Sequence, residues 1–192
     1  MTVQISGKNI DVGESLRGEI RERLDGALAK YFRGGFSGHV TLAREAARFR
    51  AECRLHLDTG MMLRAAGEAA DAYQSFDKAA ERIEKQLRRY GRRLNDHRAR
   101  DIPESGILAA DYTLAGIGDD EEAESGDGVA NPAVVAESHM QLRSMTVGMA
   151  VMALDLADEP VMLFTNAANG RLNIVYRRKD GNIGWVDPQT AG

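Results

Sequence analysis

Residues 70–100 read ADAYQSFDKAAERIEKQLRRYGRRLNDHRAR, and this stretch decides the fold of the N-terminal part of the chain. Apolar side chains recur in it at alternating spacings of three and four, which is the period of one face of an α-helix. The apolar stripe consists of Tyr73, Phe76, Ala80, Ile83, Leu87, Tyr90 and Leu94. We therefore expect a long amphipathic helix that packs on a protein core with this face.

A second stripe, of positive charge, follows the opposite side of the same helix. From Lys78 to Arg100 there are nine Lys and Arg residues against three Asp and Glu residues, and no acid stands between Glu84 and Asp96. Solvated helix faces usually mix the two signs, whereas a row of arginines suits forked contacts with phosphate groups. We therefore favour RNA as a ligand, because no zinc-ligand set, basic zipper or paired recognition helix for DNA is visible. The candidate residues are Lys78, Arg82, Lys85, Arg88, Arg89, Arg92 and Arg93.

The segment before this helix is expected to supply the sheet. Residues 1–6 alternate as a short strand, and a helix capped by Asp11 and Glu14 is expected to run to the two glycines at 34–35. Residues 49–57 form the clearest strand, since apolar and charged side chains alternate throughout. Shorter strands precede and follow it through tight connections, which predicts an antiparallel meander. Residues 1–102 are thus predicted to be one α+β domain of order β-α-β-β-β-α, a sheet with two helices on one face.

Residues 103–133 break this pattern. They hold eight acidic residues and no Lys or Arg, and they include the run GDDEEAESGDG at 118–128. Such a segment cannot bury enough apolar surface to fold, so we expect a flexible acidic linker. The formal charge is +5 for residues 1–102 and −8 for the linker, an asymmetry that indicates a nucleic-acid partner. This charge also suggests that the linker weakly shields the basic helix when no RNA is bound.

Residues 134–192 predict a small C-terminal domain of order β-α-β-β-β. Residues 134–140 read as a strand, Thr146 as the cap of a short helix, and Asp180-Gly181 as a two-residue hairpin turn. About 59 residues bury only part of their surface and are marginal alone, so we expect a second copy of the chain to cover this domain. The candidate dimer-interface residues are Phe164, Asn173, Val175 and Tyr176, and Tyr176 fits the core of a single chain equally well.

Other chemistry is sparse in this sequence. Cys53 points to the apolar side of its strand and is expected to be an inert core thiol, and the four histidines are scattered. No phosphate-binding glycine loop, nucleophile elbow or metal-ligand spacing occurs, so we expect no enzyme, no cofactor, no metal site and no small-molecule substrate. The chain lacks an apolar run of membrane length and a secretory signal, which predicts a cytoplasmic protein without membrane contact.

Three stretches resemble the long form of the ribosome hibernation-promoting factors. They are residues 2–10 (TVQISGKNI), residues 70–97 of the basic helix, and residues 164–188 (FTNAANGRLNIVYRRKDGNIGWVDP). The resemblance implies a stress or stationary-phase protein whose N-terminal domain binds the small ribosomal subunit in the path of messenger RNA and tRNA. There it would contact ribosomal RNA and neighbouring proteins and inhibit translation. It also implies that residues 134–192 form a homodimer that joins two idle ribosomes.

The resemblance assigns RNA contacts to basic positions of the helix, here Arg82, Lys85, Arg88, Arg89, Arg92 and Arg93. Two positions depart from the family pattern. Gly91 stands where relatives often have Lys or Arg, so we expect one contact to be missing and the helix to bend there. Met149 stands in a region where relatives commonly have an acid.

Two alternatives stay open at this point. The first is a general structured-RNA-binding protein of the double-stranded RNA-binding type, which reads helical RNA by its shape. The second is a partner of some other protein, for which the basic helix would be incidental.

Overall fold

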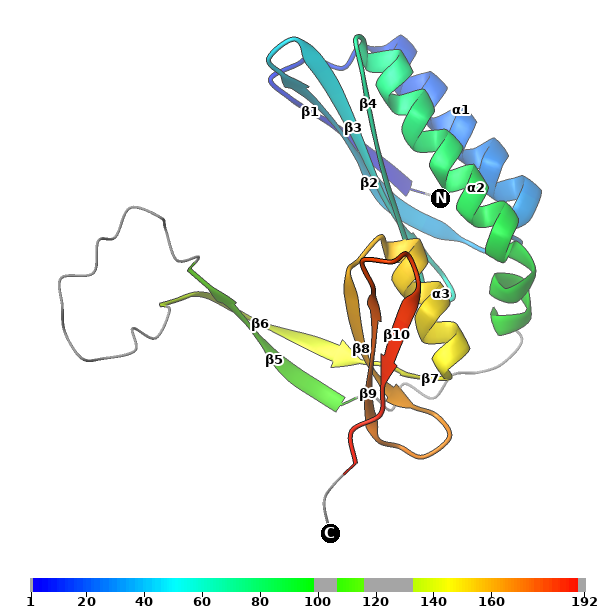
Figure 1. Cartoon of the computed structure of the whole chain (residues 1–192). Helices are drawn as coiled ribbons and strands as arrows, with labels where there is room; N and C mark the ends of the chain where they lie inside the picture. The colour runs from blue at the N-terminus through cyan, green and yellow to red at the C-terminus, as the bar shows by residue number, and fades with distance from the viewer. Residues whose placement is uncertain (1, 99–106, 116–132, 190–192) are drawn as a thin grey trace, which may run out of the picture.

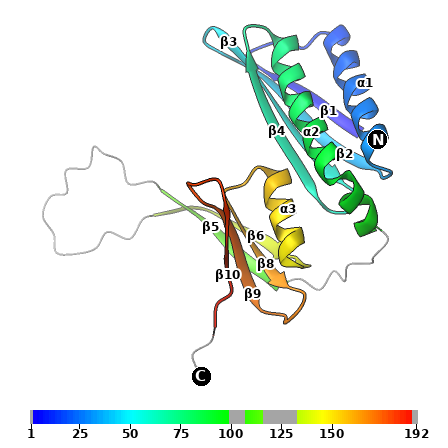
Figure 2. The same ribbon diagram turned by 45° about the vertical axis from the view of Figure 1, so that its right-hand side comes forward.

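The N-terminal domain is a four-stranded sheet with two helices packed side by side on one face (Figures 1 and 2). The structure is a computed structural model that describes residues 2–98, 107–115 and 133–189. The strand order is β1-β2-β3-β4; β1 pairs with β2 in parallel, and β2, β3 and β4 form an antiparallel meander. The elements are β1 (Thr2–Lys8), α1 (Glu14–Tyr31), β2 (Phe36–Glu45), β3 (Arg48–Leu57), β4 (Met62–Ala69) and α2 (Ala72–Arg98). The predicted β-α-β-β-β-α order is confirmed.

The core of this domain lies between the sheet and the two helices. The apolar side of β3 is buried from Ala51 to Leu57, as the alternation of residues 49–57 predicts. The apolar stripe of α2 is buried as well, except that Tyr73 in its first turn is 42% exposed and Tyr90 is half-buried. Both helices therefore use one face to cover the sheet, and α2 keeps its opposite side in solvent.

The start of α1 differs from the expectation. The residue before the helix is Gly13, and no side chain caps the helix, so the predicted Asp11–Glu14 capping box is wrong. The reason is that Val12 is buried and Arg17 donates to its carbonyl oxygen (2.9 Å) and to that of Ile5 (2.8 Å). These contacts hold the chain against the sheet, and the helix begins only after Val12.

Part of the expected linker is a strand. β5 (Ile107–Leu114) pairs in antiparallel fashion with β6 (Val134–Leu142) to form a separate two-stranded ribbon (Figure 1). The prediction of a linker rested on the acidic composition of residues 103–133 as a whole. Residues 107–114 contain only one acid, Asp111, and they pair with a segment that was itself predicted to be a strand. The acidic run at 118–128 lies outside the described residues.

The C-terminal domain is a second four-stranded sheet covered by one helix. Its strand order is β10-β9-β8-β7, and its elements are β7 (Ser144–Met145), α3 (Val147–Ala157), β8 (Val161–Asn166), β9 (Leu172–Arg177) and β10 (Ile183–Val186). The β-α-β-β-β order is confirmed, but the first strand of this sheet is β7, because residues 134–140 pair with β5 instead.

The predicted features at the ends of these elements are partly confirmed. The hydroxyl oxygen of Thr146 accepts a hydrogen bond from Met149 N (3.4 Å) and caps α3. The hairpin loop has three residues rather than two, since Arg178 N donates to Asn182 O (2.9 Å) and Gly181 adopts a left-handed conformation (φ +83°). None of the described helices is both long and apolar enough to cross a membrane.

Candidate nucleic-acid interface

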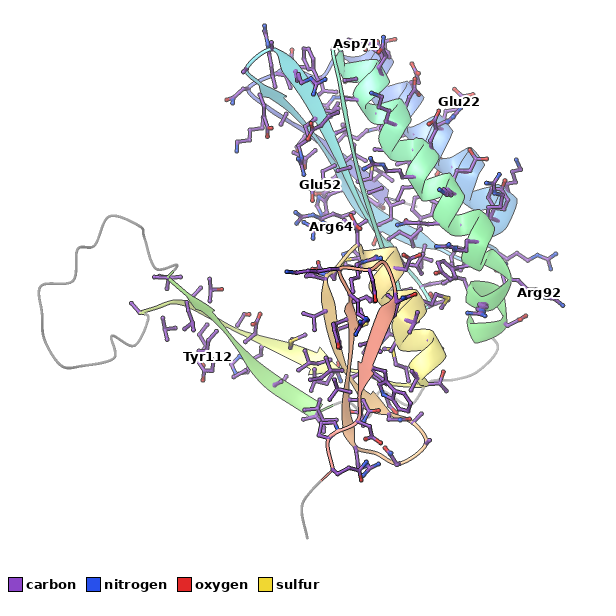
Figure 3. All side chains as sticks on the ribbon, viewed as in Figure 1. Glu22, Glu52, Arg64, Asp71, Arg92 and Tyr112 are labelled. Carbon is purple, nitrogen blue, oxygen red and sulfur yellow. The ribbon has the colours of Figure 1, made fainter. Side chains whose placement is uncertain are left out.

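All seven predicted RNA-binding side chains are exposed on α2. They follow the side of the helix that faces away from the sheet, because the apolar stripe anchors the other side in the core. Arg92 projects into solvent near the C-terminal end of α2 (Figure 3). The row extends from Lys78 to Arg93 and gives the N-terminal domain one strongly cationic face.

Two members of this row already hold structural contacts. Lys78 Nζ donates to Glu68 O (2.9 Å), and Arg82 Nη1 donates to Ala66 O (2.6 Å). These carbonyls belong to β4, which is an edge strand, so the side chains of α2 satisfy acceptors that the sheet leaves unpaired. A guanidinium carries five N–H donors, so Arg82 keeps others for a phosphate.

Four members have no fixed partner in the described part of the chain. Within residues 2–98, 107–115 and 133–189, no ion pair or hydrogen bond involves the side chains of Lys85, Arg88, Arg92 and Arg93. These four cations can therefore turn toward a phosphate backbone without breaking an existing contact. Arg89 differs, because its Nη1 lies 3.0 Å from Asp155 Oδ2 of α3.

Gly91 has a packing role rather than a missing RNA contact. It is buried, and a Cβ atom at this position would lie 2.6 Å from Tyr31 O of α1. Beside it, Asn95 donates to Tyr31 O (3.1 Å) and accepts from Arg33 N (2.9 Å). A side chain at Gly91 would therefore point into α1 and not toward a ligand, and α2 continues through this position without interruption.

A cluster of cations between the two domains was not predicted. Arg64 of β4 and Arg177 of β9 join three residues of the α2 row around a cavity of about 270 Å³. Arg64 lies on the outer face of the sheet, where it pairs with Glu52 (3.0 Å; Figure 3). Strand alternation alone places Arg64 on the outer face of the sheet, whereas only the tertiary fold brings Arg177 close to α2. The lining residues are Arg64, Ala65, Arg82, Lys85, Gln86, Arg89, Asp155, Asp158 and Arg177.

The structure buries three of the four candidate dimer-interface residues. Phe164, Asn173 and Val175 are each 0% exposed, because they lie on the face of the C-terminal sheet that α3 covers. Asn173 Oδ1 accepts from Asn166 Nδ2 (3.0 Å) and from Trp185 Nε1 (2.8 Å), which ties three elements of this domain together. In the single chain Phe164 and Val175 therefore line the interior of this domain and not an open surface, and their place in a dimer interface stays a prediction. Strand alternation in the sequence separates the two faces of this sheet, but it does not show which face α3 covers.

Tyr176 lies on the other face of that sheet, which α3 does not cover. Its ring packs over Gly184, where a Cβ atom would lie 2.3 Å from the ring. Its neighbours on this face are apolar and partly exposed: Val161 and Leu163 of β8 are 46% and 37% exposed, and Leu172 of β9 itself is 40% exposed. The uncovered apolar face consists of Val161, Leu163, Leu172, Ile174, Tyr176 and Val186.

Cys53 behaves as expected for a core thiol. It is buried, and burial raises the pKa of its thiol to about 12. Among the described residues, no three His, Cys, Asp or Glu side chains lie together in a way that could hold a metal ion.

Comparison with known proteins identifies the family. The chain matches the model of the sigma 54 modulation protein / S30EA ribosomal protein family over residues 3–95 and that of its C-terminal domain over residues 130–184. A ribosome hibernation promotion factor of Rhizobium meliloti is 48% identical over 97% of each chain. One of Bradyrhizobium diazoefficiens is 45% identical over 98% of this chain and 95% of its own. The chain belongs to the long-form ribosome hibernation promotion factor family.

The two family models match both domains of the chain but not the segment between them. Residues 96–129, which include β5, lie outside both matched ranges. The crystal structure of the N-terminal domain of Thermus thermophilus Protein Y is 27% identical, covers 47% of this chain and 99% of its own, and has a TM-score of 0.44. Membership of the family disfavours the alternative of a double-stranded RNA-binding domain.

Proposed function

We propose that this protein binds the small ribosomal subunit through the cationic face of α2, stops translation there, and pairs two ribosomes through its C-terminal domains. The observation that carries the proposal is the row of exposed cations on α2, in a family whose members are named for ribosome hibernation. A rigid helix that presents Arg and Lys at regular intervals can neutralise a row of phosphates and release their counterions.

The proposed RNA contacts centre on Lys85, Arg88, Arg92 and Arg93. The side chains of these four residues are exposed and hold no ion pair or hydrogen bond in the described residues, so binding RNA breaks nothing there. Lys78 and Arg82 are secondary contacts, since each also satisfies a carbonyl of β4. On the small subunit the domain would occupy the path of messenger RNA and tRNA and inhibit translation without any catalytic step.

The proposed pairing surface is the uncovered apolar face of the C-terminal sheet. A second copy of this chain is the partner of choice, since one apolar face can meet its own copy across a two-fold axis. Tyr176 stays a predicted interface residue. Phe164, Asn173 and Val175 would act on the dimer only indirectly, because they lie under α3. Two ribosome-binding domains held by one dimer raise the effective concentration of the second ribosome.

Replacement of three arginines tests the RNA contact. The variant Arg88→Ala/Arg92→Ala/Arg93→Ala should lose at least about tenfold in affinity for purified small subunits, because three phosphate contacts are removed. Its matched control is Arg21→Ala/Arg23→Ala/Arg48→Ala, which removes the same charge from exposed positions of α1 and β3. Equal affinity of the two variants would contradict the assignment to α2.

Replacement of one apolar residue tests the pairing surface. Leu163→Asp places a charge in the uncovered face, at a site that is 37% exposed in the single chain, so the fold should survive. We expect a monomer by light scattering that still binds small subunits. A Leu163→Asp protein that remains dimeric would contradict this choice of face.

A further inference from the structure

The C-terminal domain lies against the N-terminal domain beside the cationic face. α3 packs on β4 and lies near α2 (Figures 1 and 2). The buried apolar residues of the two domains form one continuous cluster. The chain between the two domains is long enough for them to lie apart, so the contact of α3 with β4 must arise from the residues at the interface.

The composition of α3 explains why it needs cover on more than one side. Only Gly148 and Asp155 of its 11 residues are not apolar, and a helix that is apolar all round is buried all round. Its own sheet covers one side through β8 and β9, and β4 covers another. Six residues of α3 are buried in this way: Ala150, Met152, Ala153, Leu154, Leu156 and Ala157.

The single charge of α3 points at the proposed RNA-binding helix. Asp155 Oδ2 accepts from Tyr90 OH (2.8 Å) and from Arg89 Nη1 (3.0 Å), and Asp155 Oδ1 accepts from Arg177 Nη2 (3.2 Å). Burial raises the pKa of the Asp155 carboxyl, but the hydrogen bonds from Tyr90, Arg177 and Arg89 outweigh it and lower the pKa below its ordinary value. The carboxylate thus neutralises Arg89, one of the seven predicted RNA-binding residues.

Two further contacts flank α3 on either side. Before the helix, Arg143 donates to the carbonyl oxygens of Thr59 (3.1 Å) and Gly60 in the turn between β3 and β4. After the helix, Glu159 Oε1 pairs with Arg64 Nη1 (2.9 Å). The acids of the C-terminal domain therefore meet the cations of the N-terminal domain, and Arg143 adds a clamp at the other end.

The interface also buries polar groups at a cost in stability. Gln86 Oε1 is buried without a hydrogen-bond partner among the described residues, and Arg143 is partly buried against neutral carbonyls alone, which lowers its pKa. Its ion pairs are half exposed, and such pairs contribute little stability each. A contact of this kind can open when a competing ligand binds one of its two sides.

We propose that the C-terminal domain acts as an intramolecular cover of the edge of the cationic face that carries Arg89 and the neighbouring Arg64, so that docking of α3 and binding of RNA across this edge exclude each other. This inference rests on the proposed function, because the RNA is the ligand that competes. The free chain is closed, with Arg64 and Arg89 neutralised by Glu159 and Asp155. Contact with the small subunit exchanges these carboxylates for phosphates and releases the C-terminal domain. The uncovered apolar face lies on the side of the sheet away from α3, so closure leaves it accessible to a second copy.

The first test measures closure by the separation of two labels. Dyes at Arg21→Cys on α1 and Lys179→Cys in the loop after β9 report on the two domains, and the buried Cys53 need not be removed. We expect one narrow separation by energy transfer in the free full-length chain and a longer one after addition of purified small subunits. A broad separation in the free chain, or one that is unchanged in the bound chain, would overturn the proposal.

The second test opens the interface without altering the proposed RNA contacts. Glu159→Lys replaces the attraction to Arg64 by repulsion and should raise the affinity for small subunits by about 3- to 10-fold. The control Glu137→Lys makes the same charge change on the exposed ribbon. Equal affinity of the two variants would overturn the proposal. A wild-type chain that binds no small subunits would refute the proposed function itself, whereas binding with an unchanged label separation refutes only the competition.

Discussion

The close approach of α1 and α2 at Gly91 makes a quantitative prediction. In Gly91→Ala, the added Cβ would lie 2.6 Å from Tyr31 O, so the helices must separate by about 0.8 Å to restore an ordinary contact of 3.4 Å. That shift stretches both hydrogen bonds of Asn95 to the end of α1. Overpacking of this kind costs about 1–3 kcal/mol. Gly18→Ala is the matched control, because nothing lies within 4 Å of the Cβ position at Gly18.

Both substitutions gain about 1 kcal/mol of helix propensity, so the difference between them isolates the packing cost. We expect Gly18→Ala to stabilise the domain and Gly91→Ala to be less stable than Gly18→Ala by about 1–3 kcal/mol in the free energy of unfolding. For a domain of this size, each kcal/mol shifts Tm by about 4–8 °C. Urea and thermal unfolding followed by helical circular dichroism measure this difference. Equal stabilisation by both substitutions would refute the packing explanation of Gly91.

Three further predictions concern single side chains. Asn173→Ala leaves the indole N–H of Trp185 and the side-chain amide of Asn166 without their shared acceptor. Urea unfolding followed by Trp185 fluorescence should show a loss of about 2–4 kcal/mol in the free energy of unfolding. A loss below about 1 kcal/mol would contradict a stabilising role of these hydrogen bonds. The Cys53 thiol should not react with a thiol reagent at pH 8 unless the protein is unfolded, and rapid reaction in the native state would contradict its burial. Because burial raises the pKa of this thiol, the free energy of unfolding should fall as pH rises from about 9 toward 12. The contacts of Asp155 lower the pKa of its carboxyl, so its contribution to closure is complete above about pH 4 and is lost as pH falls through the folded value. The label separation should therefore lengthen progressively as pH is lowered below about 4. A separation that stays unchanged until the protein unfolds would contradict the role of the Arg89 pair.

Periodicity was enough to predict most of the N-terminal domain. The alternation of residues 49–57 and the three-four spacing of α2 determine which side of each element is buried, and both are confirmed. The boundary of α1 could not be predicted, because it depends on the contacts of Arg17 with a strand that pairs elsewhere. β5 was missed, since a short apolar stretch within an acidic segment carries almost no local signal.

The candidate sites show the same limit. The exposed cations of α2 follow from the helix period alone, whereas the pairing of Arg89 with Asp155 joins residues 66 positions apart. Strand alternation separates Val175 from Tyr176 onto opposite faces, but only the position of α3 decides which face is buried. The packing role of Gly91 likewise follows only from the position of Tyr31 beside it in the tertiary structure.

The central claim is tested most directly by sedimentation of purified ribosomes on sucrose gradients with the full-length chain. The account predicts that the wild-type protein yields ribosome pairs and that Leu163→Asp binds single ribosomes without pairing them. It also predicts that Arg88→Ala/Arg92→Ala/Arg93→Ala stays at the top of the gradient. Ribosomes that remain single with the wild-type chain, or pairs that persist with Leu163→Asp, would contradict the assignment of pairing to the uncovered face of the C-terminal sheet.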